Sequence, residues 1–447
     1  MQNKNYTLII GLGITGFSCV KFFLKQGKNV RVVDTRSNPP QLNILQKNYP
    51  EIPVHLGEFS IDWLCNAEEI IVSPGISLEH PALQEAHSKG IPIRGDIDVF
   101  AEYAKAPIIG ITGSNGKSTV TSWLGAMSEF TGKRITIGGN IGVPVLDLLE
   151  QPIPDAYVLE LSSFQLETTY HLSLLSATIL NVSPDHLDRY ADLAAYIAAK
   201  QRIYNDCQTA VYYRADAETK PMHPVSKCVS FGLDAPAPGH YGVREISGRK
   251  YLAYGTEPLM PVDEIGVPGN HNVLNALATC ALGHTLGLSF ADLCKGLKSF
   301  PGLPHRCKKV AEKSGITWIN DSKGTNVGAT LAAIEGLAGD LSGKLILILG
   351  GDGKGADFAP LITPLSLYAR AAILLGQDAE KIQTTLQGTI LLQRVKDLTE
   401  AVQHATQLAQ AGDIVLLSPA CSSLDMFASY SARGDEFARL VTQLVLK

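Results

Sequence analysis

Long hydrophobic runs are absent from this chain of 447 residues. No segment approaches the roughly 18 continuous apolar residues that a membrane-spanning helix requires. The opening stretch MQNKNYTLIIGLGITGF contains a short apolar run, but glycines interrupt it and no small-residue cleavage site follows. We therefore expect a strand and a turn here instead of a signal peptide, and a cytoplasmic protein with no membrane partner.

Paired cysteines and an excess of positive charge are also missing. The eight cysteines are scattered singly, and none forms a C-x-x-C pair. This distribution argues against a disulfide framework or a zinc site and predicts reduced, mostly buried thiols. The formal net charge is -5. We therefore expect no nucleic acid among the partners, because no basic field would attract one.

Internal repeats and low-complexity tracts are absent as well. The length alone predicts roughly two to four domains. Short β-rich runs alternate with amphipathic stretches, which indicates α/β domains with parallel sheets. This pattern restarts near residue 100, and Pro301 and Pro304 mark a linker. We predict three domains, at residues 1–95, 96–302 and 303–447.

The expected elements follow from the same alternation. In the first block we expect strands at 7–13, 30–34, 68–75 and 92–96, and helices at 17–27 and 80–90. In the second we expect strands at 106–113, 156–163 and 176–184, and a helix at 117–132. In the third we expect strands at 315–322, 344–351, 371–376 and 413–420.

The stretch GITGSNGKST, residues 110–119, resembles a phosphate-binding loop with one glycine displaced. The common pattern G-x-x-x-x-G-K-[ST] would require glycine at Ile111. Gly113 and Gly116 still allow the backbone to curl around phosphate oxygens. A helix N-terminus favours phosphate, and Lys117 could reach the β- and γ-phosphates. The strand before and the helix after favour an ATP or GTP site over a chance turn.

A second glycine motif, GLGITG, begins at Gly11. It fits G-x-G-x-x-G after a predicted strand, and Asp34 ends the next strand. This fingerprint accommodates any ligand that carries a diphosphate, including a dinucleotide or a nucleotide sugar. Tight packing of helix on sheet, with no ligand, is the alternative.

Carboxylate and imidazole groups follow two buried strands of the second block. Glu160 lies near the end of one, and Asp185 and His186 come just after another. Beside a phosphate loop they are reasonable magnesium or substrate ligands, although structural roles remain open. Lys200 lies on a predicted helix among alanines, where a lone lysine is usually solvated.

Amides and charged groups mark further candidate positions. Asn272 and Asn275 lie on one face of a predicted helix, and Arg306 follows at the linker. They could bind adenine and phosphate, or could simply be a helix cap and a surface arginine.

Three polar loops follow strands of the third block. INDSKGTN carries Asp321, Lys323 and Thr325, GGDGKGADF carries Lys354, and LSPACSSLDMF carries Ser423. These loops could converge on a small charged ligand, if the fold brings them together.

Taken together, these stretches resemble the Mur ligase family over essentially the whole chain. GITGSNGKST is similar to the phosphate loop of that family, which has the same displaced glycine. The combination of VLELSSFQLE, NDSKGTN, GGDGKGADF and LSPACSSLDMF resembles the branch that adds D-glutamate. The resemblance implies a Rossmann-like N-terminal domain for a UDP-sugar, a central ATPase domain with a parallel sheet, and a Rossmann-like C-terminal domain for the amino acid.

The resemblance also implies roles for individual residues. It implies ATP binding by Gly113, Ser114, Asn115, Gly116, Lys117, Ser118, Thr119, Asn275, Arg306 and Asp321. It implies Mg²⁺, expected as two ions, at Ser118, Glu160, His186 and Lys200, with Lys200 carbamylated by CO₂. It implies UDP-sugar contacts at Ile14, Thr15, Asp34, Thr35, Arg36, Gly75 and Asn140, and D-glutamate contacts at Lys323, Thr325, Lys354, Ser423, Leu424 and Tyr430. Tyr430 stands where the family pattern has phenylalanine, so it adds a hydroxyl to that wall.

The activity that the resemblance implies is an amide ligation driven by ATP. The carboxylate of UDP-N-acetylmuramoyl-L-alanine would form an acyl phosphate, which the amine of D-glutamate would attack. Lys117, His186, Lys200 and Lys323 would carry the catalysis, in a chain expected to be a monomer. The alternatives are another amino-acid ligase of the family, a nicotinamide-dependent dehydrogenase that uses Gly11, and a nucleotide-driven switch or transport ATPase.

Overall fold

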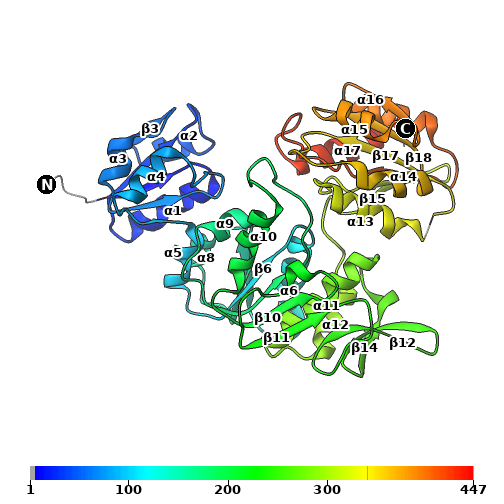
Figure 1. Ribbon diagram of the computed structural model, residues 1–447, viewed down its shortest axis with the longest axis horizontal. Helices are drawn as coiled ribbons and strands as arrows, with labels where there is room; N and C mark the ends of the chain where they lie inside the picture. Colours follow the sequence, from blue (N-terminus) through cyan, green and yellow to red (C-terminus); the bar gives the residue numbers. More distant parts are fainter. Residues whose placement is uncertain (1–5, 340, 446–447) are drawn as a thin grey trace.

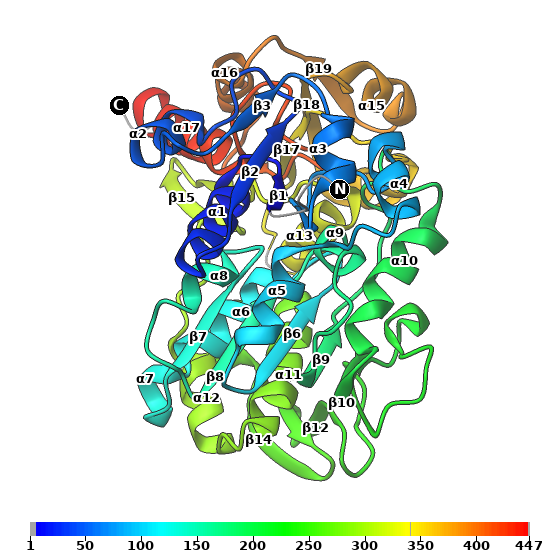
Figure 2. The same cartoon turned by 90° about the vertical axis from the view of Figure 1, so that its left-hand side faces the viewer.

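The computed structural model describes residues 6–339 and 341–445 of the chain. It has three α/β parts in chain order, which we call the N-terminal part (7–94), the central part (96–299) and the C-terminal part (308–445). Both outer parts lie on the same side of the central part (Figure 1). A view turned by 90° has the N-terminal part in front of the C-terminal part (Figure 2). Within the described ranges, no helix is long and apolar enough to cross a membrane.

The N-terminal part is a five-stranded parallel sheet in the order β3-β2-β1-β4-β5. Its strands are β1 (Thr7–Ile10), β2 (Val30–Asp34), β3 (Val54–Leu56), β4 (Glu69–Val72) and β5 (Ile93–Arg94). Its helices are α1 (Ile14–Lys25), α2 (Leu42–Asn48), α3 (Ile61–Asn66) and α4 (Pro81–Ser88). Strand order reverses between β1 and β4, the position at which doubly wound sheets bind ligands.

The first glycine motif forms the turn between β1 and α1. Gly11 has a φ of +91°, in the left-handed region. A Cβ atom on Gly16 would lie 1.7 Å from the carbonyl oxygen of Gly11. This close approach lets α1 begin immediately behind the strand, which explains the glycine at both positions.

The central part contains a six-stranded parallel sheet in the order β11-β10-β9-β6-β8-β7. Its strands are β6 (Ile108–Thr112), β7 (Ile135–Gly139), β8 (Ala156–Glu160), β9 (Leu174–Ile179), β10 (Cys207–Tyr213) and β11 (Lys227–Phe231). Its helices are α5 (Asp96–Tyr103), α6 (Lys117–Ala126), α7 (Ser128–Thr131), α8 (Val145–Leu148), α9 (Ser163–Glu167), α10 (Leu193–Gln201), α11 (Asn270–Thr285) and α12 (Phe290–Ser299). Because β6 lies between β8 and β9, the carboxyl ends of these three strands meet at one edge.

Several features of the central part differ from the sequence-based expectation, which did not include the strands β7, β10 and β11. The helix expected at 117–132 is divided at Met127, whose N–H donates to both Trp123 and Leu124 carbonyls at 3.2 Å and so tightens the last turn of α6. An antiparallel sheet of β12 (Tyr241–Ile246), β13 (Arg249–Tyr254) and β14 (Glu257–Pro261) was not anticipated. Its strands are short and polar on one face, so they give a weak signal in sequence.

The C-terminal part is a six-stranded sheet in the order β15-β16-β20-β17-β18-β19. Its strands are β15 (Lys308–Lys313), β16 (Ile316–Asn320), β17 (Leu345–Gly350), β18 (Ala369–Leu375), β19 (Leu391–Arg394) and β20 (Ile414–Leu417). Its helices are α13 (Val327–Ala338), α14 (Ile362–Tyr368), α15 (Ala379–Leu386), α16 (Leu398–Leu408) and α17 (Tyr430–Leu444). The edge strand β15 is antiparallel to β16, and the other pairs are parallel.

The apolar core clusters join two of the three parts and leave the third with clusters of its own. One core cluster runs continuously from Ile9 and Phe22 in the N-terminal part to Leu146 and Tyr157 in the central part. The apolar clusters of the C-terminal part, by contrast, contain only residues from Cys307 onward. The N-terminal part is therefore joined to the central part by a shared core, and the C-terminal part is not.

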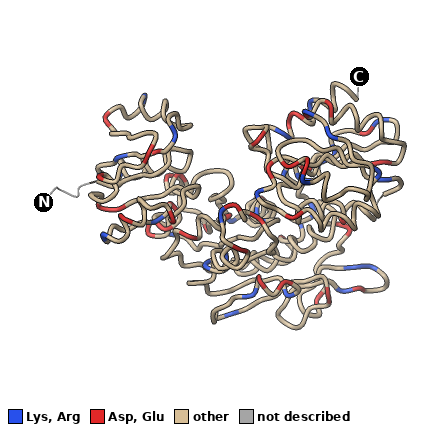
Figure 3. The backbone as a smooth tube through the Cα atoms, turned by 45° about the horizontal axis from the view of Figure 1, so that its top comes forward, with Lys and Arg blue, Asp and Glu red and all other residues tan. Residues whose placement is uncertain are grey.

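Thiols and charges agree with a reduced protein of mixed surface. All eight cysteines are free, and four of them are buried, fewer than the sequence led us to expect. Figure 3 shows acidic and basic residues interspersed over all three parts.

The close approach of Gly16 to Gly11 yields a stability prediction. We expect Gly16→Ala to lower the free energy of unfolding by about 1–3 kcal/mol or more, because a clash with backbone exceeds the roughly 1 kcal/mol that alanine gains in a helix. Gly75→Ala is the control, since an added Cβ there meets nothing within 4 Å. Urea unfolding would measure both, and an equal loss in the two variants would contradict the explanation.

Candidate active site

The phosphate loop connects β6 to α6, with its glycine-rich turn at residues 113–116. Gly116 is the N-cap of α6 and has a φ of +85°. A Cβ atom at this position would lie 2.4 Å from Oδ1 of Asn275. Only glycine therefore allows the free N–H groups at the start of α6 to remain accessible, and these groups form an anion-binding site.

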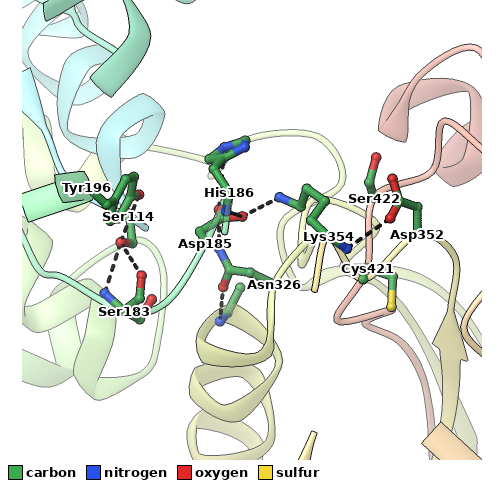
Figure 4. A network of polar contacts seen from close by, with 12 residues as sticks. Ser114, Ser183, Asp185, His186, Tyr196, Asn326, Asp352, Lys354, Cys421 and Ser422 are labelled. Carbon is green, nitrogen blue, oxygen red and sulfur yellow. Dashed lines mark hydrogen bonds and ion pairs between the residues drawn. The ribbon is translucent and has the colours of Figure 1, made fainter. Parts of the chain in front are cut away.

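The segment after β9 holds the loop in place. The Ser183 N–H donates to Oγ of Ser114 at 2.9 Å, and that hydroxyl donates to the Ser183 carbonyl at 2.9 Å. The Asn115 N–H donates to Oδ1 of Asn181 at 2.9 Å. Figure 4 shows the serine pair beside Tyr196. The loop is thus held by the chain itself in the shape that an anion would require.

A partly buried lysine and a fully buried one donate to the same carbonyl of the phosphate loop. Nζ of Lys117 lies 2.8 Å from the Gly113 oxygen, and Nζ of Lys200 lies 3.0 Å from the same atom. Burial lowers the pKa of both amines, and for Lys200 the neighbouring Lys117 lowers the pKa further. The expectation of a solvated Lys200, drawn from its helix alone, was wrong, because α10 directs this side chain into the interior, where it is 1% exposed.

Glu160 ends β8 with one oxygen satisfied and one not. Its Oε1 accepts from Nδ2 of Asn140 at 2.9 Å, whereas Oε2 is buried without a hydrogen-bond partner. A buried carboxylate oxygen with no partner is costly, and a cation at this position would remove the cost. The residue therefore fits a metal ligand.

Two more of the expected magnesium ligands, His186 and Ser118, line the same cavity as Glu160. His186 packs edge-on against Phe164 with ring centroids 4.9 Å apart, and burial lowers the pKa of its imidazole to about 4, so it is neutral at pH 7. Oγ of Ser118 accepts from Nη2 of Arg306 at 3.1 Å. The described residues contain no cluster of three or more His, Cys, Asp or Glu suited to a metal. An ion here would need oxygens from elsewhere, as Mg²⁺ commonly takes from phosphates.

The C-terminal part contacts this edge through charged and amide groups. Lys354 forms an ion pair with Asp185, and Nδ2 of Asn326 donates to the other oxygen of Asp185 at 3.0 Å (Figure 4). Burial acts to raise the pKa of Asp185, but Lys354, His186 and Asn326 together outweigh it, and the carboxyl pKa is lowered. Two of the three predicted loops of the third block therefore bond directly to this edge, and the third lines the same cavity through Ser423 and Leu424.

Lys323 and Tyr430 form a cation–π pair. Nζ of Lys323 lies 4.0 Å from the centroid of the Tyr430 ring. Burial lowers the pKa of Lys323 to about 8, and the nearby Arg306 lowers it as well. The ring at position 430 thus provides a face for this cation, which a phenylalanine would also provide.

One cavity of about 550 Å³ joins the three parts. The expected site residues that line it are Gly75, Ser114, Asn115, Gly116, Lys117, Ser118, Asn140, Glu160, His186, Arg306, Lys323, Thr325, Lys354, Ser423, Leu424 and Tyr430.

A second cavity of about 130 Å³ begins behind the phosphate loop and combines polar residues with apolar walls. Its expected site residues are Thr119, Asn275 and Asp321, together with Asn115, Gly116, Arg306 and Lys323, which line both cavities. Burial raises the pKa of Asp321 to about 6.

Other expected residues lie outside both cavities. Gly113 and Lys200 lie beneath the phosphate loop, and Ile14, Thr15, Asp34, Thr35 and Arg36 lie on the N-terminal part away from the lining. Oδ2 of Asp34 accepts from the Leu12 N–H at 2.7 Å and forms an ion pair with Arg36. The structure therefore places the expected residues of the phosphate loop and the C-terminal part around shared cavities. Most of the N-terminal residues expected to bind the UDP-sugar lie away from these cavities.

Sequence reasoning missed several residues on the cavity walls. Phe164, Asp188, Arg189 and Asp352 line the larger cavity, and His271 lines the smaller. A signal existed for Asp188 and Arg189, because both directly follow the polar pair at 185–186 in DHLDRY. His271 gave no signal, since a histidine in the first turn of a helix is unremarkable.

The chain matches three family models that together span most of its length. They are described as "Mur ligase MurD-like, N-terminal domain" at residues 5–95, "Mur ligase middle domain" at 111–283, and "Mur ligase, glutamate ligase domain" at 305–421.

Curated relatives and a solved structure agree with these models. The UDP-N-acetylmuramoylalanine--D-glutamate ligase of Pseudomonas syringae pv. syringae is 52% identical over 440 residues, or 98% of each chain. The protein of the same name from Pseudomonas aeruginosa is 50% identical over 445 residues, or 99% of each chain. The UDP-N-acetylmuramate-alanine ligase MurC of Thermotoga maritima shares the fold, with a TM-score of 0.62, 21% identity, and coverage of 98% of this chain and 99% of that one.

The matches at every level and over nearly the full length leave one conclusion: this chain belongs to the Mur ligase family.

Proposed function

We propose that this chain catalyses the ATP-dependent addition of D-glutamate to UDP-N-acetylmuramoyl-L-alanine, a step of peptidoglycan precursor synthesis in the cytoplasm. The observation that carries the proposal is the single cavity on which the phosphate loop, Gly75 of the N-terminal part and the cations of the C-terminal part all lie. Relatives about half identical over the full length bear the name of this activity, which supports the choice of substrates.

The reaction needs no covalent bond to the enzyme. The alanyl carboxylate attacks the γ-phosphorus of ATP, ADP leaves, and an acyl phosphate forms. The amine of D-glutamate then attacks the acyl carbon, and the amide forms as phosphate departs and the nitrogen loses a proton. Lys117 and Arg306 face the phosphates and offset the negative charge that develops.

ATP would occupy both cavities. Its phosphates would lie on the N–H groups of residues 113–119, and the adenosine would extend into the smaller cavity beside Asn275 and Asp321. The larger cavity would then leave space beside Lys117 for the acyl acceptor.

Magnesium would be held by Ser118, Glu160, His186 and a modified Lys200. The unpaired Oε2 of Glu160 and the neutral imidazole of His186 are the observations that fit this ion. When bound, two Mg²⁺ ions would neutralise phosphate charge and orient the γ-phosphate. Ser118 would exchange its hydrogen bond with Arg306 for the ion.

Carbamylation of Lys200 would complete this set of ligands. The lowered pKa leaves more of the amine neutral at pH 7, and only the neutral amine attacks CO₂. A bond forms between Nζ and the carbon of CO₂, one proton is released, and the product has anionic oxygens. The modification thus converts a buried cation beside Lys117 into an oxygen donor, which also removes the repulsion between the two.

D-Glutamate would lie between the loops of the C-terminal part. Its carboxylates would be bound by Lys323, Thr325, Lys354 and Ser423, and Leu424 and Tyr430 would line the wall. Lys354 must leave Asp185 for this, so Asp185 would become free as the anionic amino acid arrives.

The UDP-sugar would bind across the N-terminal part at Ile14, Thr15, Asp34, Thr35 and Arg36, and enter the cavity at Gly75 and Asn140. Support comes from the turn of Gly11 and Gly16, which leaves the start of α1 open to a diphosphate. The three parts would therefore serve as the nucleotide-sugar, ATP and amino-acid domains, with limits near residues 95 and 302. We propose a monomer, since each site is formed within one chain.

Substrate dependence tests the proposed function directly. We expect phosphate release from ATP and Mg²⁺ only when UDP-N-acetylmuramoyl-L-alanine and D-glutamate are both present. L-Glutamate, L-lysine and buffer are the matched controls. Release with L-lysine would keep the family and change the amino acid, and release without any acceptor would favour a switch or transport ATPase.

Removal of the buried amine tests the carbamate. We expect Lys200→Ala to lower turnover by at least about 10–100-fold, as loss of a metal-site residue typically does. Short carboxylic acids such as acetate should restore part of the rate by replacing the carbamate oxygens. Arg202→Ala is a control in the next turn of the chain, where the side chain donates only to the Leu166 and Thr169 carbonyls. Full activity of Lys200→Ala would remove this residue from the mechanism.

Titration of Lys323 predicts a pH effect on the binding of D-glutamate. The pKa of about 8 means that the cation is present below pH 8 and is lost above it. The KM for D-glutamate should therefore rise about tenfold for each pH unit above 8. Lys323→Arg keeps its charge to higher pH, so its KM should be nearly constant from pH 7 to 9. An equal rise in both enzymes would mean that another group titrates.

A further inference from the structure

One loop of the central part contacts the phosphate loop and a segment of each of the other two parts. Residues 181–190, which we call the junction loop, lie between β9 and α10. Its first residues hold the phosphate loop through the bonds of Asn181 and Ser183 described above. Its middle residue Asp185 pairs with Lys354 of the C-terminal part. Its last turn carries Arg189.

Arg189 extends from the junction loop to the N-terminal part. Its Nη2 donates to the Ile76 carbonyl at 3.2 Å and to Oε2 of Glu167 at 3.2 Å. The guanidinium lies 5.4 Å from the centroid of the Phe164 ring. Ile76 directly follows Gly75, which lines the cavity together with Arg189. A shift of this segment on binding of the nucleotide sugar would therefore act on Arg189.

The side chain of Arg189 makes few hydrogen bonds, so it can follow a movement of its partners. All its side-chain hydrogen bonds within residues 6–339 and 341–445 come from Nη2, and its side chain is 18% exposed on the cavity wall. The ion pair with Glu167 keeps the charge near the Ile76 carbonyl. Lys117, Lys323 and Lys354, by contrast, point into the cavity from sites that would touch the phosphates or the amino acid.

We propose that Arg189 is a positioning residue that couples occupancy of the nucleotide-sugar site to the phosphate loop. This inference rests on the proposed function. Binding at Gly75 fixes the segment with Ile76, Arg189 follows it, and the junction loop adjusts Asn181 and Ser183 against Ser114 and Asn115. Nucleotide sugar and ATP would then bind more tightly together than singly.

Such coupling is reciprocal and can be measured without turnover. The experiment compares the Kd of a non-hydrolysable ATP analogue with Mg²⁺ in the absence and presence of saturating UDP-N-acetylmuramoyl-L-alanine. For the wild type we expect saturating nucleotide sugar to lower the Kd of the ATP analogue by at least about fivefold, which is the lower end of typical coupling factors. For Arg189→Ala we expect the ratio of the two Kd values to fall to about one, while the Kd of the analogue alone changes less than about threefold.

Controls separate coupling from a merely structural role. Arg202→Ala likewise removes an arginine with two side-chain hydrogen bonds, but both of its acceptors, the Leu166 and Thr169 carbonyls, lie within the central part. Its coupling ratio should therefore remain that of the wild type. Glu167→Gln removes the ion pair of Arg189 and should reduce the ratio only in part. If circular dichroism shows that Arg189→Ala does not fold, Arg189→Lys is measured instead. Its ratio should still fall, because an ammonium lacks the planar group that lies near the Phe164 ring while Nη2 reaches Ile76 and Glu167.

The outcomes distinguish this inference from the proposed function. A wild-type ratio of one, or an unchanged ratio in a folded Arg189 variant, would overturn the coupling role while phosphate release with D-glutamate still supported the ligase. Failure of the wild type to bind UDP-N-acetylmuramoyl-L-alanine would overturn the proposed function, and the coupling with it.

Discussion

The site depends on one electrostatic constraint, the crowding of several cations at the phosphate-loop edge. Lys117, Lys200, Arg306, Lys323 and Lys354 meet there, and several lower one another's pKa. Carboxylates line the same cavities, but Asp185 is already paired with Lys354 and Asp321 accepts from the Ser418 hydroxyl. Cations held this close repel one another, and bound anions would relieve that repulsion. Triphosphate, diphosphate and dicarboxylate are anions that suit such a cluster.

Local signals were enough to predict the elements that position the site. The phosphate loop was identified because strand, glycines and helix follow one another within ten residues, and the turn at Gly11 for the same reason. The antiparallel sheet of β12–β14 and the edge strand β15 gave little signal, because short polar strands depend on their partners. The break at Met127 was also missed, because a bifurcated bond within one helical run leaves no mark in the residue pattern.

The roles of single side chains were harder to predict than the elements. Lys200 and a surface lysine look the same on an alanine-rich helix, and only the packing of α10 against the phosphate loop separates them. The sequence offered the resemblance as the reason to expect a buried lysine, and the structure places Nζ of Lys200 within 3.0 Å of Gly113. Arg189 and His271 were not predicted, because their importance arises from which segments lie beside them, and that is a property of the whole fold.

The unequal interfaces have a thermal consequence. The N-terminal part shares an apolar core with the central part, whereas the polar contacts of the C-terminal part include the Lys354–Asp185 ion pair and the Asn326 hydrogen bond to Asp185. Separating the C-terminal part would divide none of its own apolar clusters, so the heat-capacity change of that separation should be smaller than that of unfolding a core. The enthalpy of this separation should therefore change little with temperature, whereas the enthalpy of unfolding the apolar cores changes strongly. Cooling should therefore affect the separation and return of the C-terminal part less than it affects motions that expose apolar surface.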